Sequence, residues 1–312
     1  MRNPQSISRR GLMKSLAIGA TGLAAGCAPV SAESKTPAAK KQPNIILFLV
    51  DDMGWQDTSV PFWTEKTFYN NRYRTPNMER LAAQGVKFTQ AYACAICSPT
   101  RVSLMTGMNP ARHRVTNWTL QKNKSKDRRH PELDFPKWNV NGMQPVAGIE
   151  RTVHAKALPA QLGELGYHTI HVGKAHFGAI GTPSDNPKAI GFDVNIAGHA
   201  GGGPGGYTGL TNFGNVKGEH TRPWGCPGME KYHGKDIFLT EALTIEANAA
   251  MDKAVAAKKP FFLYMAHYAI HAPLKTPDKR FYDFYENQKI NHTEAIYASL
   301  IEGMDKSLGD LV

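Results

Sequence analysis

The sequence predicts an α/β fold in which a mixed, mostly parallel sheet is sandwiched by helices. Two nearly unbroken apolar runs, over residues 44–50 (NIILFLV) and 260–265 (PFFLYM), are typical of strands buried on both faces. A third segment, 167–172, alternates in the manner of a strand. Helix-like segments separate these strands, and such alternation predicts a parallel sheet that binds ligands at the carboxyl ends of its strands.

The other elements follow from local signals. Thr75 is a candidate N-cap for a helix, Pro76 suits its first turn and Gly85 would end it. A second helical run begins near Cys97 and ends at Gly107. The remaining predicted elements are a strand-like segment over 86–93, a polar and basic loop over 119–151, helices over 157–165, 236–258 and 292–312, and a glycine-rich loop over 198–209.

The composition excludes several classes of protein. The chain has 312 residues, 41% of them hydrophobic and 20% charged, which suffices for a large core and argues against wholesale disorder. Four cysteines are too few for a disulfide-stapled miniprotein, and no window reaches the roughly 18 apolar residues of a membrane span. The net charge is +11, of which residues 43–312 carry +5. This mildly basic body suits an anionic substrate, and we expect no nucleic-acid partner.

Residues 1–32 are typical of a bacterial export signal. Residues 8–14 read SRRGLMK, and a short apolar run and small residues follow. The pair Arg9 and Arg10 indicates the twin-arginine (Tat) route, which exports folded proteins and makes the Tat translocase a partner. The alternative interpretation is a basic amphipathic helix. The export signal predicts a periplasmic or extracellular location.

The end of the signal allows two interpretations. The sequence VSA fits cleavage after Ala32, whereas AAGC resembles a lipobox that would anchor the protein to lipid through Cys27. We favour cleavage, because alanine stands where a lipobox usually has leucine. A polar linker over 33–42 and the body of the protein over 43–312 follow.

Asp51 and Asp52 follow directly after the first predicted strand, where α/β folds place ligands. Adjacent carboxylates repel each other and are costly to bury unless a cation or a base neutralises them. One interpretation is a hard divalent cation held by oxygen ligands, and the other is a solvated turn, since Asp favours turns. The position at the end of a strand favours the metal.

A second group of polar residues lies in the sequence CSPTR, residues 97–101. Pro99 suits a first helical turn, which places Cys97 near a helix N-terminus, where an anion is favoured. Arg101 is four residues later and can lie on the same face. A nucleophile and a guanidinium that converge on an anion suit a sulfate or phosphate ester. The alternatives are a redox pair of Cys94 and Cys97, or two inert buried cysteines.

These segments resemble a known family. CSPTR, followed by a helix of small residues and Thr-Gly, resembles the signature of type I (formylglycine-dependent) sulfatases in the alkaline-phosphatase superfamily. Four other segments resemble further motifs of that family: PNIILFLVDDMGWQD, TPNMERLAAQGVKFTQAYA, YHTIHVGKAHFG and FFLYMAHYAIHAPLKTP. GFDVNIAG, residues 191–198, resembles a segment of polysaccharide sulfatases. The resemblance covers residues 43–312 and implies an alkaline-phosphatase-like fold.

The resemblance implies a nucleophile and a metal. Cys97 matches the cysteine that a formylglycine-generating enzyme oxidises to formylglycine before folding. The hydrated aldehyde attacks sulfur with one hydroxyl and uses the other to eliminate sulfate. Asp51, Asp52 and the group derived from Cys97 match ligands of one Ca2+ ion, and Arg101 matches the arginine that steadies this site.

The resemblance also implies groups that bind sulfate. Lys174 and His176 match a sulfate-binding lysine and a histidine near the nucleophile, and they can face one side of an extended segment. His271 matches the histidine that protonates the leaving alcohol or binds sulfate. Taken without the family, each of these side chains has an ordinary structural interpretation. His267 has no matching role and is predicted to be structural, and the glycine-rich loop is by default a surface loop.

The resemblance predicts that this chain is the N-terminal part of a sulfatase, without the C-terminal part and the smaller subdomain. The family's second metal-ligand pair, Asp-Asn, would lie beyond Val312, and the sheet should then end on an unpaired edge. Asp185 and Asn186 imitate that pair but precede GFDVNIAG, so we do not assign them to the metal.

The predicted function is hydrolysis of sulfate esters, with a sulfated carbohydrate or an aryl sulfate as substrate. One alternative stays in the superfamily and is a phosphate or phosphonate ester hydrolase. The other is an inactive exported protein that binds sulfated glycans.

Overall fold

The structure is a computed structural model that describes residues 42–134, 137–217 and 219–312. The predicted export signal, its cleavage site, Cys27 and nearly all of the predicted linker lie outside the described residues. In the described ranges, no helix combines the length and the apolar character needed to cross a bilayer.

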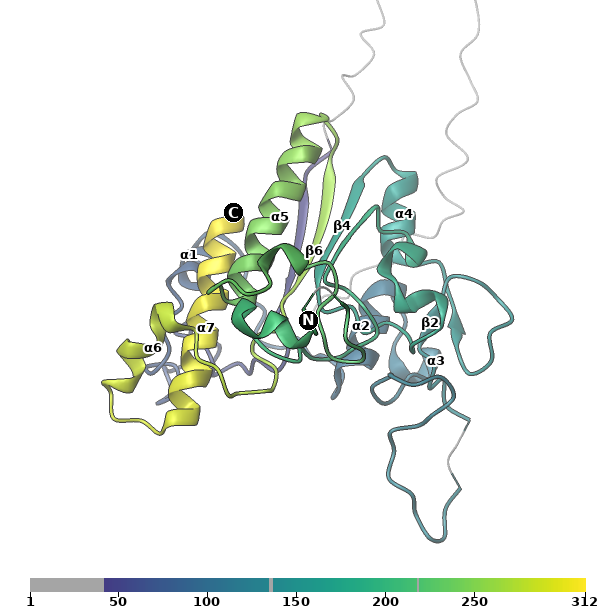
Figure 1. Ribbon diagram of the computed structural model, residues 1–312, viewed down its shortest axis with the longest axis horizontal. Helices are drawn as coiled ribbons and strands as arrows, with labels where there is room; N and C mark the ends of the chain where they lie inside the picture. The colour runs from purple at the N-terminus through teal and green to yellow at the C-terminus, as the bar shows by residue number, and fades with distance from the viewer. Residues whose placement is uncertain (1–41, 135–136, 218) are drawn as a thin grey trace, which may run out of the picture. The chain divides into compact units, whose positions relative to one another are not determined.

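A four-stranded parallel sheet lies among the helices (Figure 1). Its strands, in spatial order, are β1 (Ile45–Leu49), β6 (Phe261–Ala266), β4 (His168–Gly173) and β5 (Val194–Ile196). β6 is buried along its whole length and pairs with β1 on one side and β4 on the other. A separate parallel pair joins β2 (Met143–Gln144) to β3 (Val153–His154). The predicted parallel sheet is therefore confirmed, and β5 is an additional strand.

Helices cover both faces of this sheet (Figure 1). They are α1 (Pro76–Gln84), α2 (Cys97–Thr106), α3 (Pro110–His113), α4 (Leu158–Glu164), α5 (Leu239–Ala256), α6 (Lys279–Glu286) and α7 (His292–Leu311), with short 3-10 helices at Pro183–Asp185, Pro187–Ile190, Gly209–Gly214 and Glu230–Tyr232. Successive side chains of β6 point to opposite faces. Leu263 and Met265 pack with α5 and α7, whereas Phe262 and Tyr264 pack with α2 and α4. The sheet is thus sandwiched, as predicted.

The start of α1 differs from the prediction. Thr75 occupies the N-cap position, but its side chain makes no capping hydrogen bond and instead bonds the hydroxyl groups of Thr58 and Ser59. The backbone N–H groups of Asn77 and Met78, in the first turn of α1, donate hydrogen bonds to the carboxylate of Asp305 on α7. A side chain from a distant helix therefore does the work expected of a local cap.

The segment 86–93 is not a strand, contrary to the prediction. Val86, Phe88 and Tyr92 are 80%, 73% and 89% exposed, and no described strand pairs with this segment. A strand pattern needs a neighbouring strand to satisfy its backbone, and none adjoins it in the described ranges.

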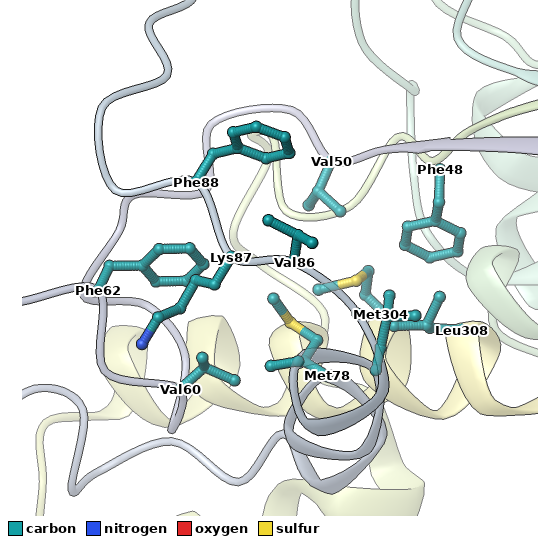
Figure 2. Close-up of a pocket in the computed structure, with 13 residues that line it drawn as sticks. Phe48, Val50, Val60, Phe62, Met78, Val86, Lys87, Phe88, Met304 and Leu308 are labelled. Atoms are coloured by element: carbon teal, nitrogen blue, oxygen red, sulfur yellow. The ribbon is translucent and has the colours of Figure 1, made fainter.

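The outer edge of β1 is unpaired in the described part of the chain. An apolar pocket of about 500 Å3 lies beside this edge, and Figure 2 shows Phe48 of β1 next to Met304 and Leu308 of α7. Met78 of α1 and Val86 line the same pocket (Figure 2). The helices therefore cover the faces of β1 and leave its edge open.

Candidate active site

Asp51 is the centre of the candidate site. It follows β1 and is 9% exposed, and its Oδ2 accepts a hydrogen bond from Nη2 of Arg101 at 3.0 Å. The ammonium of Lys174, which follows β4, forms an ion pair with the same oxygen. Parallel strands bring their carboxyl ends to one edge of the sheet, so β1 and β4 deliver these two residues together.

Gly173 makes the position of Lys174 possible. Its φ is +94°, and a Cβ at this position would overlap the carbonyl of Ala266 on β6. The backbone N–H of Lys174 donates to that same carbonyl at 2.7 Å. Only glycine fits so close to a neighbouring strand at this φ, and the turn directs Lys174 into the buried interior, where it is 0% exposed.

The two adjacent carboxyl groups have opposite pKa shifts. Burial alone would raise the pKa of Asp51, but Arg101 and Lys174 outweigh it and hold this pKa well below its ordinary value. Burial raises the pKa of Asp52, and the neighbouring charge of Asp51 raises it further. Burial, reinforced by Arg101, lowers the pKa of Lys174. Asp51 is therefore a permanent anion, whereas Asp52 binds a proton more readily.

Asp52 lies close to His271. Its φ is +67°, a left-handed conformation that Asp adopts more readily than most residues. Its Oδ2 lies 3.7 Å from Nε2 of His271, and the His271 ring donates from Nδ1 to the carbonyl of Ala272 at 2.8 Å. That hydrogen bond fixes the ring and leaves Nε2 toward the carboxylate.

Cys97 is the first residue of α2 and shares a pocket of about 230 Å3 with Asp51, Asp52 and Arg101. Its helix is capped at the far end by Gly107, with φ +68°, as predicted. No side chain of the described residues caps the N-terminus of α2, so its N–H groups and dipole favour an anion beside Cys97. Cys94 and Cys97 are free thiols, and Sγ of Cys94 contacts the hydroxyl of Ser103.

His176 is buried and held in one tautomer. It is 1% exposed with φ +55°, and its Nε2 donates to the carbonyl of Thr119 at 2.6 Å. Burial lowers its pKa well below the ordinary value, and Lys174 lowers it further. The imidazole is therefore neutral, with Nδ1 as a hydrogen-bond acceptor.

The glycine-rich loop covers the two site histidines and is not a plain surface loop. Its residues 198–204 are buried. A Cβ at Gly202 would overlap the ring of His176, and one at Gly203 would lie 3.1 Å from Nδ1 of His271. The Tyr207 hydroxyl donates to the carbonyl of His271 at 2.6 Å. Glycine is needed here because the backbone approaches both rings closely.

Two other sequence assignments can be followed in the structure. Asp185 accepts from the backbone N–H of Ala200 at 3.1 Å and from Nη1 of Arg222 at 2.6 Å, so it anchors the glycine-rich loop. His267 is buried on the other side of the sheet end, where its Nε2 lies 2.8 Å from the Ser307 hydroxyl of α7. Neither residue lines the pocket that Asp51 shares with Cys97.

Two further residues, which the sequence did not indicate, position the site. Tyr264 lies on β6, and its hydroxyl is 3.4 Å from Nη1 of Arg101. Thr119 accepts from His176 and donates its N–H to the Ser98 hydroxyl at 3.1 Å. The alternation along β6 could have indicated Tyr264, whereas no local signal distinguishes Thr119 within a polar loop.

The described residues fit only part of a calcium site. The carboxylates of Asp51 and Asp52 are the oxygen ligands that hard cations prefer. However, no three His, Cys, Asp or Glu side chains of the described ranges lie close enough to hold a metal ion. Asp51 is already neutralised by Arg101 and Lys174. Within the described ranges, Asp51 and Asp52 therefore supply only part of the ligands that a calcium ion needs.

Comparison with known proteins identifies the family. Residues 43–312 match the family model described as Sulfatase. The chain belongs to the sulfatase family. The chain is 32% identical over 272 residues to the N-acetylgalactosamine-6-sulfatase of Canis lupus familiaris, an alignment that covers 83% of this chain and 43% of the relative. It is 28% identical over 268 residues to the arylsulfatase of Klebsiella aerogenes, covering 85% of this chain and 51% of the relative.

A solved structure agrees with this assignment. The crystal structure of Ps i-CgsB superposes on this chain with a TM-score of 0.62 and 30% sequence identity, over 86% of this chain and 54% of the other. The same protein has been solved in complex with k-i-k-neocarrahexaose. The chain spans about half the length of the curated relatives it matches.

Proposed function

We propose that this sulfatase hydrolyses sulfate esters, with a sulfated carbohydrate as its substrate. The observation that carries the proposal is the shared pocket in which Cys97, at the N-terminus of α2, meets Asp51 and Arg101. A guanidinium, a buried ammonium and a helix N-terminus form a site for an anion of tetrahedral shape.

The nucleophile of the proposed reaction derives from Cys97. Oxidation by a formylglycine-generating enzyme would supply a hydrated aldehyde whose hydroxyl group can attack sulfur. Arg101 is already fixed by Asp51 and by the carbonyl of Lys174, so it steadies the base of the pocket without rearrangement. Lys174 supplies positive charge to the sulfate oxygens.

The two histidines have separate proposed roles. His271 presents Nε2 beside the exposed carboxylate of Asp52, and we assign it the donation of a proton to the leaving alcohol. His176 is neutral, with Nε2 committed to Thr119, so its Nδ1 can accept a hydrogen bond from a hydroxyl at the nucleophile. Asp51 and Asp52 remain the proposed ligands of a calcium ion.

The proposed substrate class is supported by the relatives. One relative is named for a sulfated amino sugar, and a similar structure holds a neocarrahexaose. The basic balance of the body and the cations around Asp51 suit an anionic glycan.

We also propose export by the Tat route to the periplasm or beyond, with cleavage after Ala32. The twin arginines in the sequence carry this proposal. Replacing Arg9 and Arg10 with lysine should trap the precursor in the cytoplasm, as detected by fractionation. Unchanged export would overturn it.

The activity is tested on the full chain, expressed with a formylglycine-generating enzyme. Mass spectrometry of tryptic peptides should show Cys97 as the aldehyde or its hydrate. The protein should hydrolyse an aryl sulfate faster than the matched aryl phosphate, and Cys97→Ala should abolish this activity. Cys94→Ala is the matched control and should retain it. Faster turnover of the phosphate would favour the phosphatase alternative, and glycan binding without turnover by modified protein would favour the binding protein.

A further inference from the structure

Trp118 lies beside the candidate site. Its ring centroid is 6.4 Å from that of His176. The next residue, Thr119, is bonded through its carbonyl to His176 and through its N–H to Ser98, the neighbour of Cys97. These two hydrogen bonds fix the backbone next to Trp118, so the indole has a defined place at the rim of the site.

A lysine is held over this indole. Nζ of Lys126 lies 4.7 Å from the centroid of the Trp118 ring, within the range of a cation–π interaction. Within the described ranges, Lys126 forms no ion pair with a carboxylate. Its charge is therefore free to meet an anion from outside the protein.

The loop that carries Lys126 is itself fixed. The carboxylate of Asp127 accepts from Nδ2 of Asn117 at 2.7 Å and from the hydroxyl of Ser125 at 2.6 Å. Asn117 precedes Trp118, and Asp127 follows Lys126. The hydrogen bond between Asn117 and Asp127 therefore holds the segment that carries the lysine next to the segment that carries the indole. A cation placed in advance loses little conformational entropy when it binds a ligand.

A second pair of an aromatic ring and a cation lies near Trp118 and Lys126. Trp118, Lys126 and Trp138 line one small depression, and the guanidinium of Arg114 lies 5.3 Å from the ring centroid of Trp138. Aromatic rings next to cations suit a sulfated sugar, because the C–H face of the sugar packs on a ring while its sulfate meets an ammonium.

We propose that Trp118 and Lys126 form a saccharide subsite that binds a second anionic group of the substrate, on a sugar next to the ester that is cleaved. The proposal rests on the proposed function, because it assumes that the substrate is a sulfated carbohydrate. Trp118 is the contact between the catalytic pocket and this subsite, and Lys126 is its charged end. The sulfatase should therefore prefer a saccharide with sulfate on adjacent sugars.

Binding to the full chain carrying Cys97→Ala tests the subsite, because this variant cannot consume the ligand. The probe is a sulfated galactan hexasaccharide, and the comparison is the same hexasaccharide after desulfation. Calorimetry should show that Lys126→Met weakens binding of the sulfated probe about tenfold, the loss of one charge-assisted hydrogen bond. The dependence on salt should fall as well. Trp118→Leu should weaken binding of both probes.

Two controls keep the result interpretable. Lys124→Met removes an exposed charge two residues away on the same loop and should leave the affinity unchanged. Lys126→Arg should restore binding. If Lys126→Met lowers the melting temperature but changes neither affinity, the pair only stabilises the loop and the subsite is overturned. Failure of the proposed function is seen separately, as absent aryl sulfate turnover by the modified protein with no further substitution.

Discussion

The Asp51 carboxylate and the Arg101 guanidinium are joined at 3.0 Å in a site where the arginine is only 1% exposed. The same guanidinium donates to the carbonyl of Lys174 at 2.6 Å. One side chain on α2 therefore connects the ends of β1 and β4. This arrangement makes the candidate site part of the structural framework, with direct consequences for stability.

Arg101→Met should lower the free energy of unfolding by about 3–5 kcal/mol, because it removes one partner of a buried ion pair and leaves carbonyl and carboxylate oxygens without that donor. Urea titration followed by circular dichroism measures the change. Arg112→Met, at an exposed arginine of α3, is the control and should change stability by less than about 0.5 kcal/mol. Equal stability of both variants would show that Lys174 alone neutralises Asp51.

Acid should destabilise the protein through its buried histidines. Burial lowers the pKa of His267 to about 3. Between pH 6.5 and 3 the unfolded chain gains a proton on this histidine that the folded chain does not. Stability is therefore fully present above pH 6.5 and is lost as the pH falls, by up to about 1.4 kcal/mol per pH unit.

His267→Gln should flatten this dependence, as measured by urea midpoints at pH 7, 6, 5 and 4. The glutamine retains a donor for the Ser307 hydroxyl and cannot titrate. His154→Gln, at an exposed position on β3, should leave the slope as it is. An unchanged slope in His267→Gln would show that other groups cause the acid sensitivity.

The glycine-rich loop should not tolerate a methyl group beside the site. In Gly202→Ala the added carbon would overlap the His176 ring, so the ring or the loop must move. We expect a loss of about 1–3 kcal/mol in stability and a fall in sulfate ester turnover. Gly163→Ala is the contrasting substitution, since it lies inside α4 with open space around its Cβ, and it should stabilise by up to about 1 kcal/mol. Thermal melts and initial rates distinguish the two.

Asp305→Ala should destabilise the contact between α7 and α1 by about 2 kcal/mol. It leaves the part-buried N–H groups of Asn77 and Met78 without this acceptor. Asp310→Ala, on the same helix, removes only an exposed ion pair with Lys306 and should cost less than about 1 kcal/mol. Chemical denaturation of both variants gives the comparison, and similar losses would contradict the capping role.

Local sequence patterns predicted the elements whose signals are local. The apolar runs of β1 and β6 and the glycine after α2 have meaning within a few residues, and the structure contains them. The cap of α1 could not be predicted, because Asp305 lies 228 residues from Asn77 in the sequence. The segment 86–93 has the residue pattern of a strand, but a strand forms only beside another strand. Local sequence does not show whether such a partner strand is present.

The residues of the candidate site also differ in whether local sequence could predict them. Asp51, Cys97 and Arg101 were predicted from a strand end and a helix start, and the structure brings them to one pocket with Lys174 close by. The burial of the glycine-rich loop was not predicted, because it depends on rings from two other segments that lie against it. Trp118 was not predicted either, because its place beside the site depends on its proximity to His176, which is distant in the sequence.

The pairing of β1 with β6 also determines when the sheet can form during synthesis of the chain. Ile45 aligns with Phe262 and Leu49 with Ala266, so the sheet cannot close until the ribosome has made the chain to that point. Cys97 emerges about 170 residues earlier, and at about 5–20 residues per second this leaves it accessible for roughly ten to thirty seconds. The proposed oxidation of Cys97 in the unfolded chain would therefore have to occur within a time that the order of the strands fixes. Moving β6 earlier in the chain, by circular permutation, would shorten that time.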